Sequence, residues 1–330
     1  MTDAEDFTGA TGAALDAFGL DGADCRLVIV GENVTFRVGD PAGDGSYVLR
    51  LHRPGYHDLP ELDSERVWLA ALEQAGIRVP EPVAAPDGRY YVPVPVGPDD
   101  IRFAGLTRWR DGEIVADPSA GDDGPGPLAP QLAQLGTLMA AMHEQAIGWT
   151  PPAGFVRHRL DADGLLGLDP FWGRFWENDD LSAAQQERLA GARRALHQQL
   201  VDHGPPRDRF SMIHADLHLG NLLVDDDGRL SVFDFDDAGW GWHHYDIAVA
   251  LLHTRDAPDA GDAETAFLDA YRAMRPLADE DLAWITVFEV IRGLALIGWK
   301  GQRPEVHWPA ARFDALVEST FTGLDRLALP

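Results

Sequence analysis

The sequence contains almost no cysteine, almost no lysine and no long apolar run. One cysteine, Cys25, among 330 residues excludes an intrachain disulfide framework and a cysteine-rich zinc site. Lys300 is the only lysine, which excludes any mechanism that needs a lysine in the N-terminal half. Spanning a bilayer takes roughly 18–20 uninterrupted apolar residues. The most apolar stretch, 285–299, is interrupted by Glu289 and Arg292, so we expect no transmembrane segment.

Positive charge is also scarce. The chain carries 27 Lys and Arg residues against 54 Asp and Glu residues, a formal net charge of −27. Such a field repels phosphate backbones and anionic lipid, so we expect neither a nucleic-acid partner nor a membrane partner. The N-terminus is acidic where a signal peptide is basic, which indicates a cytoplasmic protein. An acidic surface suits cationic or metal-neutralised ligands, and it equally serves solubility.

The rest of the composition is that of a globular protein with two differently patterned parts. Hydrophobic residues make up 45% and charged residues 25% of the chain, and its length corresponds to about two domains. The first hundred residues contain short β-branched or aromatic runs separated by turn residues, and one amphipathic stretch. We predict strands at 26–30, 33–38, 46–51, 89–96 and 101–108, and a helix at 60–75.

Helical periodicity dominates beyond an acidic loop, rich in Gly and Pro, over 111–130. We predict helices at 128–145, 183–201, 245–253, 264–273, 280–299 and 309–327. The exception is a set of short apolar runs at 211–214, 222–224 and 230–233, which predicts a hairpin around the Asp-Asp-Asp-Gly turn at 225–228. The fold class is therefore α+β, with a small sheet-rich part followed by a large helical part.

Residues that can do chemistry concentrate in one segment. The stretch 213–224 reads IHADLHLGNLLV, and the next apolar strand is followed by DFDD. Two strand ends can hold Asp216, Asn221 and Asp234 close together, and Mg²⁺ is usually held by such carboxylate and amide oxygens plus substrate phosphates. The same residue types also occur in turns without a ligand, which is the alternative. A further carboxylate, Asp246, starts an apolar helix, where we expect it to cap the helix and anchor a loop.

This spacing, His-x-Asp-x-x-x-x-Asn and then an apolar strand ending in Asp-Phe, resembles the catalytic and metal loops of the protein-kinase-like fold. It is most similar to the aminoglycoside phosphotransferase and choline kinase superfamily, which usually has Gly where this chain has Ala215. The resemblance implies that Asp216 accepts the proton of the substrate hydroxyl, and that Asn221 and Asp234 bind Mg²⁺. His214 would support the loop rather than react.

The resemblance extends into the N-terminal half, where it implies a nucleotide site. The turn GENVTF at 31–36 corresponds to the turn that covers the phosphates, so backbone N–H groups around Glu32 and Asn33 would face them. The following strand places Arg50 where the family has a phosphate-contacting base, usually Lys. Glu65, on the next helix, would be the acidic partner of Arg50. Arginine stays charged and binds phosphate bidentately, but its geometry differs from that of lysine.

The last strand of the N-terminal half resembles the hinge between the two lobes of this family. There Arg108 and Trp109 would offer backbone groups to a purine. The implied architecture is a two-lobed protein-kinase-like fold. Its parts are a nucleotide-binding lobe at 1–105, a hinge at 106–112 and a helical lobe with the catalytic and metal loops at 113–330.

The implied activity is the Mg²⁺-dependent transfer of the γ-phosphate of ATP or GTP to a hydroxyl group of a small molecule such as an aminoglycoside, choline or homoserine. RLHRP at 50–54 and the paired Asp236 and Asp237 resemble the stress-response kinase and homoserine-kinase-like branch. That branch leaves the Ser and Thr hydroxyls of proteins as an alternative acceptor. The partners are thus a nucleotide and a hydroxyl-bearing substrate, and the sequence leaves the oligomeric state open.

Two other classes of function stay as alternatives. His214, Asp216 and His218 could ligate zinc in a metallohydrolase, with His243 and His244 recruited as further ligands. The arginine that stands in place of the family's lysine motivates the second alternative, a catalytically silent nucleotide-binding relative.

Overall fold

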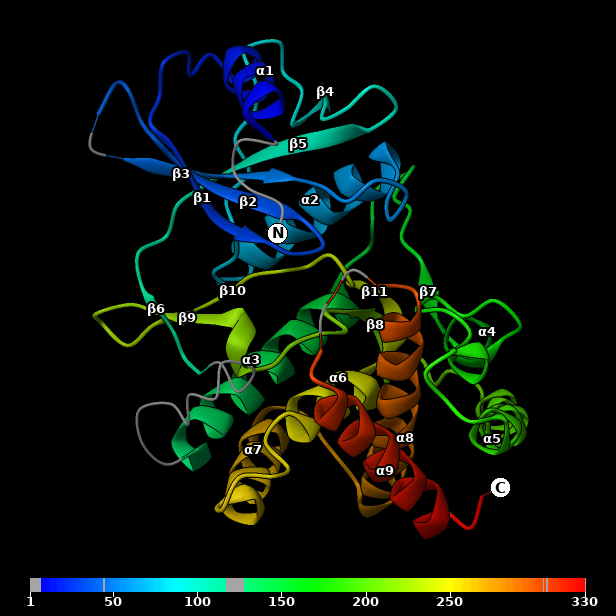
Figure 1. Cartoon of the computed structure of the whole chain (residues 1–330). Coiled ribbons are helices and arrows are strands. Elements are labelled where there is room, and N and C mark those ends of the chain that lie inside the picture. Colours follow the sequence, from blue (N-terminus) through cyan, green and yellow to red (C-terminus); the bar gives the residue numbers. More distant parts are fainter. Residues whose placement is uncertain (1–6, 44, 117–127, 305, 307, 330) are drawn as a thin grey trace. The chain divides into compact units, whose positions relative to one another are not determined.

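The computed structural model describes residues 7–43, 45–116, 128–304, 306 and 308–329. The acidic N-terminus and residues 117–127 of the predicted acidic loop lie outside the described residues. The chain forms two compact units, whose elements are labelled in Figure 1. The first unit comprises Met1–Glu113, Thr150–Val156 and Leu223–Phe233, and the second comprises Ile114–Trp149, Arg157–Leu222 and Asp234–Pro330.

The first unit is built on a five-stranded antiparallel sheet (Figure 1). In sheet order the strands are β1 (Cys25–Val30), β2 (Val34–Gly39), β3 (Ser46–Leu51), β5 (Ile101–Arg108) and β4 (Tyr91–Pro95). All five predicted strands are confirmed, although β4 is shorter than predicted. Arg89 belongs to the preceding turn, where its N–H donates to Asp87 Oδ1 (3.0 Å). β4 lies at an edge, where Pro93 and Pro95 can be tolerated although they lack an N–H group.

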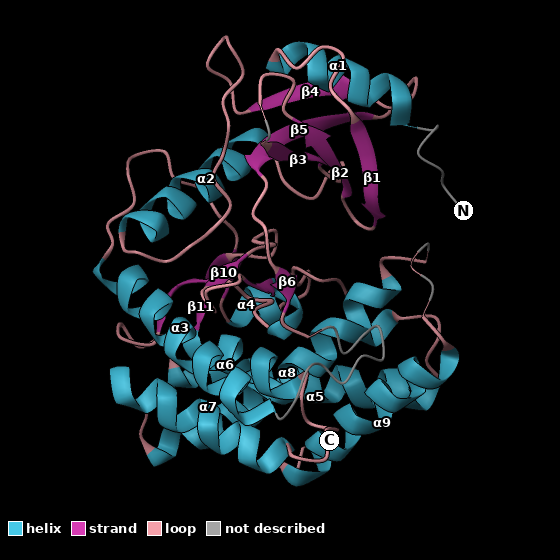
Figure 2. Ribbon diagram, turned by 90° about the vertical axis from the view of Figure 1, so that its left-hand side faces the viewer, coloured by secondary structure: helices cyan, strands magenta, loops and turns pink. Residues whose placement is uncertain are grey.

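One face of this sheet carries an apolar core. Alternation along the strands puts Val34 and Phe36 of β2 on the same face as Leu49 and Leu51 of β3, and all four are buried. The helix α1 (Thr8–Phe18), which the sequence does not predict, covers this face (Figures 1 and 2). Its glycines and threonines have low helix propensity, so packing against the sheet rather than propensity stabilises it.

The helix α2 (Leu59–Gln74) is the predicted helix of the first unit and lies on the other side of the sheet from α1 (Figures 1 and 2). It begins with a capping box: Asp58 Oδ1 accepts the N–H of Glu61 (2.9 Å), and Glu61 Oε2 accepts the N–H of Asp58 (3.1 Å). Its buried side includes Trp68 and also Glu65, which is only 7% exposed. α2 thus places a carboxylate in the interior of this unit.

The second unit is mainly helical. Its helices are α3 (Leu128–Gly148), α4 (Ala162–Leu166), α5 (Ala183–His203), α6 (His243–Leu252), α7 (Ala260–Met274), α8 (Asp279–Gly301) and α9 (Ala310–Arg326). The six predicted helices are confirmed, and only the short α4 was not predicted. α3 packs against α7, and α8 packs against α6 and α9. Gly136 allows the first of these contacts, because a Cβ there would lie 2.4 Å from the carbonyl oxygen of Phe267.

Two three-stranded sheets complete the description, in the orders β10-β9-β6 and β7-β11-β8. Their strands are β6 (Glu113–Ile114), β7 (Arg159–Leu160), β8 (Phe210–Ile213), β9 (Leu222–Val224), β10 (Leu230–Val232) and β11 (Gly239–Trp242). β11 runs antiparallel to β8 and parallel to β7. β6 forms inside the segment that was predicted to be a loop.

The predicted hairpin is right for two of its three runs. β9 and β10 are neighbours around the turn at 225–228, but the run at 211–214 forms β8, which pairs with β11 instead. The strand β11 was not predicted because its sequence, GWGW, contains two glycines, which weaken the strand signal. Gly241 is needed there, since a Cβ would lie 2.4 Å from Cδ1 of Ile213 on β8.

Within the described residues, one helix, α8, is long and apolar enough to cross a membrane by length and composition. However, 61% of its most apolar window is buried inside the structure. Burial of this kind is typical of the core helix of a globular domain. We therefore describe α8 as a core helix of the second unit rather than as a membrane span.

Candidate active site

Asp216 and Asn221 lie together after the end of β8. The loop after β8 carries Asp216, and the short 3₁₀ turn Leu219–Asn221 follows it. The side-chain amide of Asn221 donates to the main-chain carbonyl of Asp216 (2.8 Å) and lies 3.3 Å from Asp216 Oδ2. Because these contacts use the amide nitrogen, Oδ1 is the atom of Asn221 that suits a cation. The structure therefore brings two of the predicted site residues together.

The loop that carries Asp216 has an unusual backbone. Ala215 has a φ of +66° and is 0% exposed. This left-handed conformation is easy for glycine and unfavourable for other residues, and holding it costs of order 1–3 kcal/mol. The same requirement explains why glycine is usual at this position in the family that the motif resembles.

Asp246 of α6 stabilises this loop. Its Oδ1 accepts the N–H of Ala215 (2.6 Å), and its Oδ2 accepts the N–H of His214 (3.1 Å) and lies 3.1 Å from Nε2 of His143. The predicted anchoring of a loop by Asp246 is confirmed. The predicted capping role is wrong, because α6 begins directly after Trp242 and Asp246 lies inside its first turn.

Arg292 of α8 forms an ion pair with Asp216, from Nη2 to Oδ1. Its side chain is 6% exposed, and its guanidinium also lies near the hydroxyl of Tyr245 (3.4 Å) and the ring of Trp172 (5.9 Å to the centroid). Burial by itself would raise the pKa of the Asp216 carboxyl, but the charge of Arg292 lowers this pKa below its ordinary value. Asp216 is therefore ionised at neutral pH.

Sequence reasoning missed Arg292 as a site residue, because it lies 76 residues after Asp216. It was noted only for interrupting an apolar stretch. That interruption is itself the signal, because a charged residue on the buried side of an apolar helix needs a partner of opposite charge. The other interruption, Glu289, meets the same need with Arg255 (2.6 Å).

Two stacked imidazoles lie beside Asp216. Nε2 of His218 is 3.8 Å from Asp216 Oδ2, and the rings of His218 and His253 stack with centroids 4.0 Å apart. Nδ1 of His218 accepts the N–H of Gly220 (3.0 Å), so the proton of the neutral ring is on Nε2. Burial and the neighbouring His218 lower the pKa of His253 to about 3, so that ring is neutral. His218 is thus held in place as a donor near the Asp216 carboxylate.

The loop of Asp234 contacts the loop of Asp216. The ring of Phe235, directly after Asp234, lies against the ring of His214, with centroids 4.6 Å apart. His214 is buried, and its Nδ1 accepts the N–H of Asp216 (3.3 Å), which is the supporting role predicted for it. Asp234, like the residue before Asp216, has a positive φ, of +66°.

Arg157 fixes the segment after Asp234. It is buried, and its guanidinium donates to three carbonyl oxygens of that segment. These belong to Phe235 (3.2 Å), Asp236 (2.7 Å) and Ala238 (2.6 Å). The role of Arg157 could not be predicted, since backbone carbonyls leave no pattern in a sequence.

In the first unit, the predicted phosphate turn is bound to the residues after β3. The N–H of Arg53 donates to Oδ1 of Asn33 (2.9 Å), and the guanidinium of Arg53 pairs with Glu32 (2.7 Å). The side chains of Glu32 and Asn33 therefore have partners within this unit and fix the shape of the turn.

Arg50 lies on the face of the sheet opposite the apolar core. Its neighbours across the sheet are Thr35 on β2 and Gly105 on β5, whereas the flanking Leu49 and Leu51 face the core. α2, with the buried Glu65, lies on this same side. The pairing of Arg50 with Glu65 stays a prediction.

Arg108 and Trp109 end β5 and follow it. Their main-chain N–H groups donate to the carbonyl oxygens of Glu81 (2.9 Å) and Ser46 (2.9 Å). The Arg108 side chain also pairs with Glu81 (3.2 Å), and the guanidinium of Arg37 lies over the Trp109 ring (4.4 Å). Because these N–H groups are already used, a purine bound at this segment would have to contact other groups.

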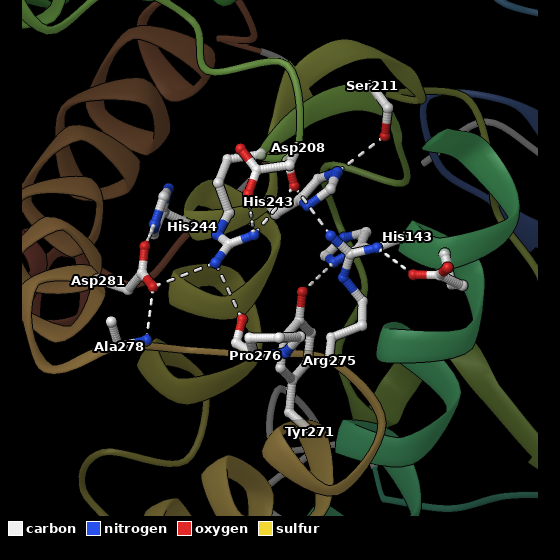
Figure 3. A network of polar contacts seen from close by, with 12 residues as sticks. His143, Asp208, Ser211, His243, His244, Tyr271, Arg275, Pro276, Ala278 and Asp281 are labelled. Atoms are coloured by element: carbon white, nitrogen blue, oxygen red, sulfur yellow. Dashed lines mark hydrogen bonds and ion pairs between the residues drawn. The ribbon is translucent and has the colours of Figure 1, made fainter. Parts of the chain in front are cut away.

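Figure 3 shows a polar network that includes His143, the histidine that bonds Asp246. His143 bonds Asp246 through Nε2, and its Nδ1 lies 2.8 Å from the hydroxyl of Tyr271. The rings of His143 and His243 stack with centroids 4.0 Å apart and planes 7° from parallel. The network therefore supports the anchor of the catalytic loop from its other side.

The same network engages the histidines of the zinc alternative. His243 Nε2 bonds Ser211 Oγ (2.8 Å), and His244 Nε2 bonds Asp281 Oδ1 (2.8 Å), as Figure 3 shows. Both histidines are buried among these partners. This arrangement argues against their recruitment to a zinc centre.

The buried histidines predict a protein that is sensitive to acid. Burial lowers the pKa of His143 and, together with the neighbouring His143, that of His243, below the ordinary value of 6.5. Below pH 6.5 the unfolded chain therefore binds protons that the folded chain does not bind, so stability falls as the pH falls. Each such group contributes up to about 1.4 kcal/mol per pH unit. Urea unfolding between pH 7 and 5 should show this slope, and His243→Asn should flatten it; an unchanged slope in that variant would contradict the assignment.

The two loops and the two units together define the class of protein. A carboxylate and an amide held at one loop, a second carboxylate loop against it and a separate five-stranded sheet are the parts of a kinase-like phosphotransferase. The model of the phosphotransferase enzyme family matches residues 29–278, and the chain belongs to this family. The matched residues include four strands of the five-stranded sheet, the end of β1 and both loops.

Solved structures and curated relatives agree with this membership. The microcompartment-associated aminopropanol kinase is 32% identical, with a TM-score of 0.79 over 95% of this chain and 94% of that chain. Homoserine kinase of Methylobacillus glycogenes is 29% identical, over 82% of this chain and 76% of that protein. Amicoumacin kinase hAmiN, at 21% identity, shares the fold, with a TM-score of 0.72 over 90% of this chain and 87% of its own. The chain is thus a kinase of the small-molecule type with a two-lobed α+β fold, as the motif resemblance predicts.

Proposed function

We propose that the chain transfers the γ-phosphate of ATP to the hydroxyl group of a small amino alcohol. The observation that carries this proposal is an ionised Asp216 bonded to Asn221, beside the loop of Asp234. Phosphoryl transfer needs little covalent chemistry from the protein, since positioning and charge stabilisation lower most of the barrier. The site must therefore supply a base, oxygen ligands for a divalent ion and a cation for the phosphates.

Asp216 is the proposed base. Its Oδ1 is bound by Arg292, whereas the neighbours of Oδ2 are more distant, Asn221 Nδ2 at 3.3 Å and His218 Nε2 at 3.8 Å. Oδ2 is therefore the oxygen that orients the acceptor hydroxyl and takes its proton as the hydroxyl attacks phosphorus. The lowered pKa keeps Asp216 ionised, so it can accept a proton. Because a carboxylate of low pKa is a weak base, the proton is transferred late in the reaction.

Asn221 and Asp234 are the proposed Mg²⁺ ligands. An amide oxygen and a carboxylate suit this hard cation, and the hydrogen bond from Nδ2 of Asn221 leaves Oδ1 for it. When bound, the ion neutralises charge on the phosphates. The solved amicoumacin kinase holds AMP-PNP, an ATP analogue, together with Ca²⁺, which supports a nucleotide paired with a divalent cation.

The first unit supplies the proposed nucleotide contacts. For the phosphates these are the backbone around Glu32 and Asn33 and the side chain of Arg50 with its acidic partner Glu65. For the purine they are groups of Arg108 and Trp109 other than the two main-chain N–H groups, which are already bonded. Arg50 would contact the phosphates from the side of the sheet opposite the apolar core, with Glu65 of α2 as its acidic partner. The lobe boundaries belong to the same proposal, with the nucleotide-binding lobe at 1–105, the hinge at 106–112 and the helical lobe at 113–330, as does a cytoplasmic location.

The relatives and the net charge support the proposed class of acceptor. Homoserine and aminopropanol, which name two of the similar kinases, are both alcohols that carry an amine. A net charge of −27 favours a cationic acceptor over an anionic one, although it does not select a particular molecule.

A transfer screen tests the proposal. The purified chain is incubated with Mg²⁺ and γ-labelled ATP or GTP, and with homoserine, 1-amino-2-propanol, choline, an aminoglycoside or casein. The Asp216→Asn variant is the blank. We expect label on an amino alcohol with ATP as donor. Label on casein alone, or stoichiometric zinc in a protein that transfers no phosphate, would refute the proposal.

A further inference from the structure

Arg292 is almost completely enclosed by protein. Its Nε is buried without a hydrogen-bond partner among the described residues, and its side chain is 6% exposed. The ring of Trp172 lies over the guanidinium, and the hydroxyl of Tyr245 lies 3.4 Å from its Nη1; these two aromatic rings stack with centroids 5.6 Å apart. A substrate could hardly reach this guanidinium. Arg292 therefore acts on the reaction through the residue that it binds.

The helix that carries Arg292 has little room to move. A Cβ at Gly293, the next residue, would lie 2.4 Å from Oγ1 of Thr320 on α9. A Cβ at Gly298 would lie 2.7 Å from the carbonyl oxygen of Trp172. α8 is thus in close contact on two sides, so the backbone position of Arg292 is well fixed.

The carboxylate of Asp216 is held from two sides. Arg292 binds Oδ1 from α8, while Asn221 binds the main-chain carbonyl of Asp216 and approaches Oδ2 (3.3 Å). The ion pair occupies Oδ1, so Oδ2 is the carboxylate oxygen that stays available for a substrate.

We propose that Arg292 is a positioning residue for phosphoryl transfer, which binds Oδ1 of Asp216 so that Oδ2 faces the acceptor hydroxyl. The inference rests on the proposed role of Asp216 as the base. A misplacement of about 1 Å in a reacting group can cost about 10²-fold in rate. Arg292 supplies a charge and a planar guanidinium, whose Nη2 binds Asp216 while Nη1 approaches the Tyr245 hydroxyl (3.4 Å), and lysine supplies only the charge.

The rate test compares two substitutions with a matched control. Arg292→Met should lower kcat about 100-fold and leave the KM for ATP within about threefold, since only the orientation of Asp216 changes. Arg292→Lys should recover about tenfold of that loss. The control is Arg255→Met. It removes the partner of Glu289, which lies on the same helix as Arg292, and it should leave kcat unchanged. The acceptor is whichever of homoserine or 1-amino-2-propanol the wild-type protein phosphorylates.

A second measurement does not depend on activity. Urea midpoints are compared for Asp216→Asn, Arg292→Met and the double variant. If the two side chains hold each other, the double variant should lose less than the sum of the two single losses. Additive losses, or a folded Arg292→Met protein with wild-type kcat, would overturn the proposal.

If Arg292→Met does not fold, Arg292→Lys takes its place. A wild-type kcat in Arg292→Lys would show that the planar guanidinium is not needed to position Asp216. Transfer retained in Asp216→Asn would instead refute the base assignment, and the midpoints separate these two failures.

Discussion

Asp216→Asn should lower kcat by about 10²- to 10⁴-fold, the range expected when a general base is removed. The amide keeps the size of the carboxylate, but it cannot accept the hydroxyl proton. The loop should keep its conformation, because Asn221 binds the main-chain carbonyl of Asp216 and Asp246 binds the N–H groups before it. Steady-state kinetics and circular dichroism of the same preparation measure both effects.

The matched control for this prediction is Asp227→Asn. Asp227 lies in the turn between β9 and β10, and its side chain is 72% exposed. An exposed ion pair contributes about 0–1 kcal/mol, so this variant should match the wild-type protein in rate and stability. Full turnover by a correctly folded Asp216→Asn protein would remove Asp216 from the mechanism and with it the proposed arrangement of the site.

The parts of the fold that could be predicted are those whose signal is local. The strands β2 and β3 alternate apolar and polar residues, and helices such as α3 and α8 show a clear apolar side. The order of residues in the motif also predicted that Asp216 and Asn221 lie together, since only four residues separate them and apolar strands flank them. These features need no knowledge of the rest of the chain.

The parts that could not be predicted depend on contacts between distant segments. α1 has weak helix propensity and exists because it covers the sheet. The glycines of β11 lie close to other segments, Gly241 to Ile213 of β8 and Gly239 to His158. Arg157 and Arg292 act through partners far along the chain, one through backbone carbonyls and the other through a single carboxylate. In each of these cases tertiary packing, rather than local sequence preference, decides the structure.

Asp246→Ala should destabilise the protein by about 3–5 kcal/mol. This is the largest loss of stability that we expect from a substitution that affects the loop of Asp216. Asp246 is buried and satisfies three donors, the N–H groups of His214 and Ala215 and Nε2 of His143. Each donor left buried without a partner costs about 1–3 kcal/mol. Urea unfolding at pH 7 measures the loss. Asp246→Asn, which keeps one acceptor oxygen, should lose less.

Activity should fall together with this anchor, since Asp246 stabilises the left-handed conformation at Ala215 that positions Asp216. Ala215→Gly provides the diagnostic background, because glycine adopts a φ of +66° without the strain. In that background Asp246→Ala should lose less kcat than in the wild-type protein, measured at a temperature where both are folded. Asp262→Ala, in the first turn of α7 and exposed, is the control and should change stability by no more than about 1 kcal/mol. Equal losses of kcat in both backgrounds would show that Asp246 acts on Asp216 by another route than the Ala215 backbone.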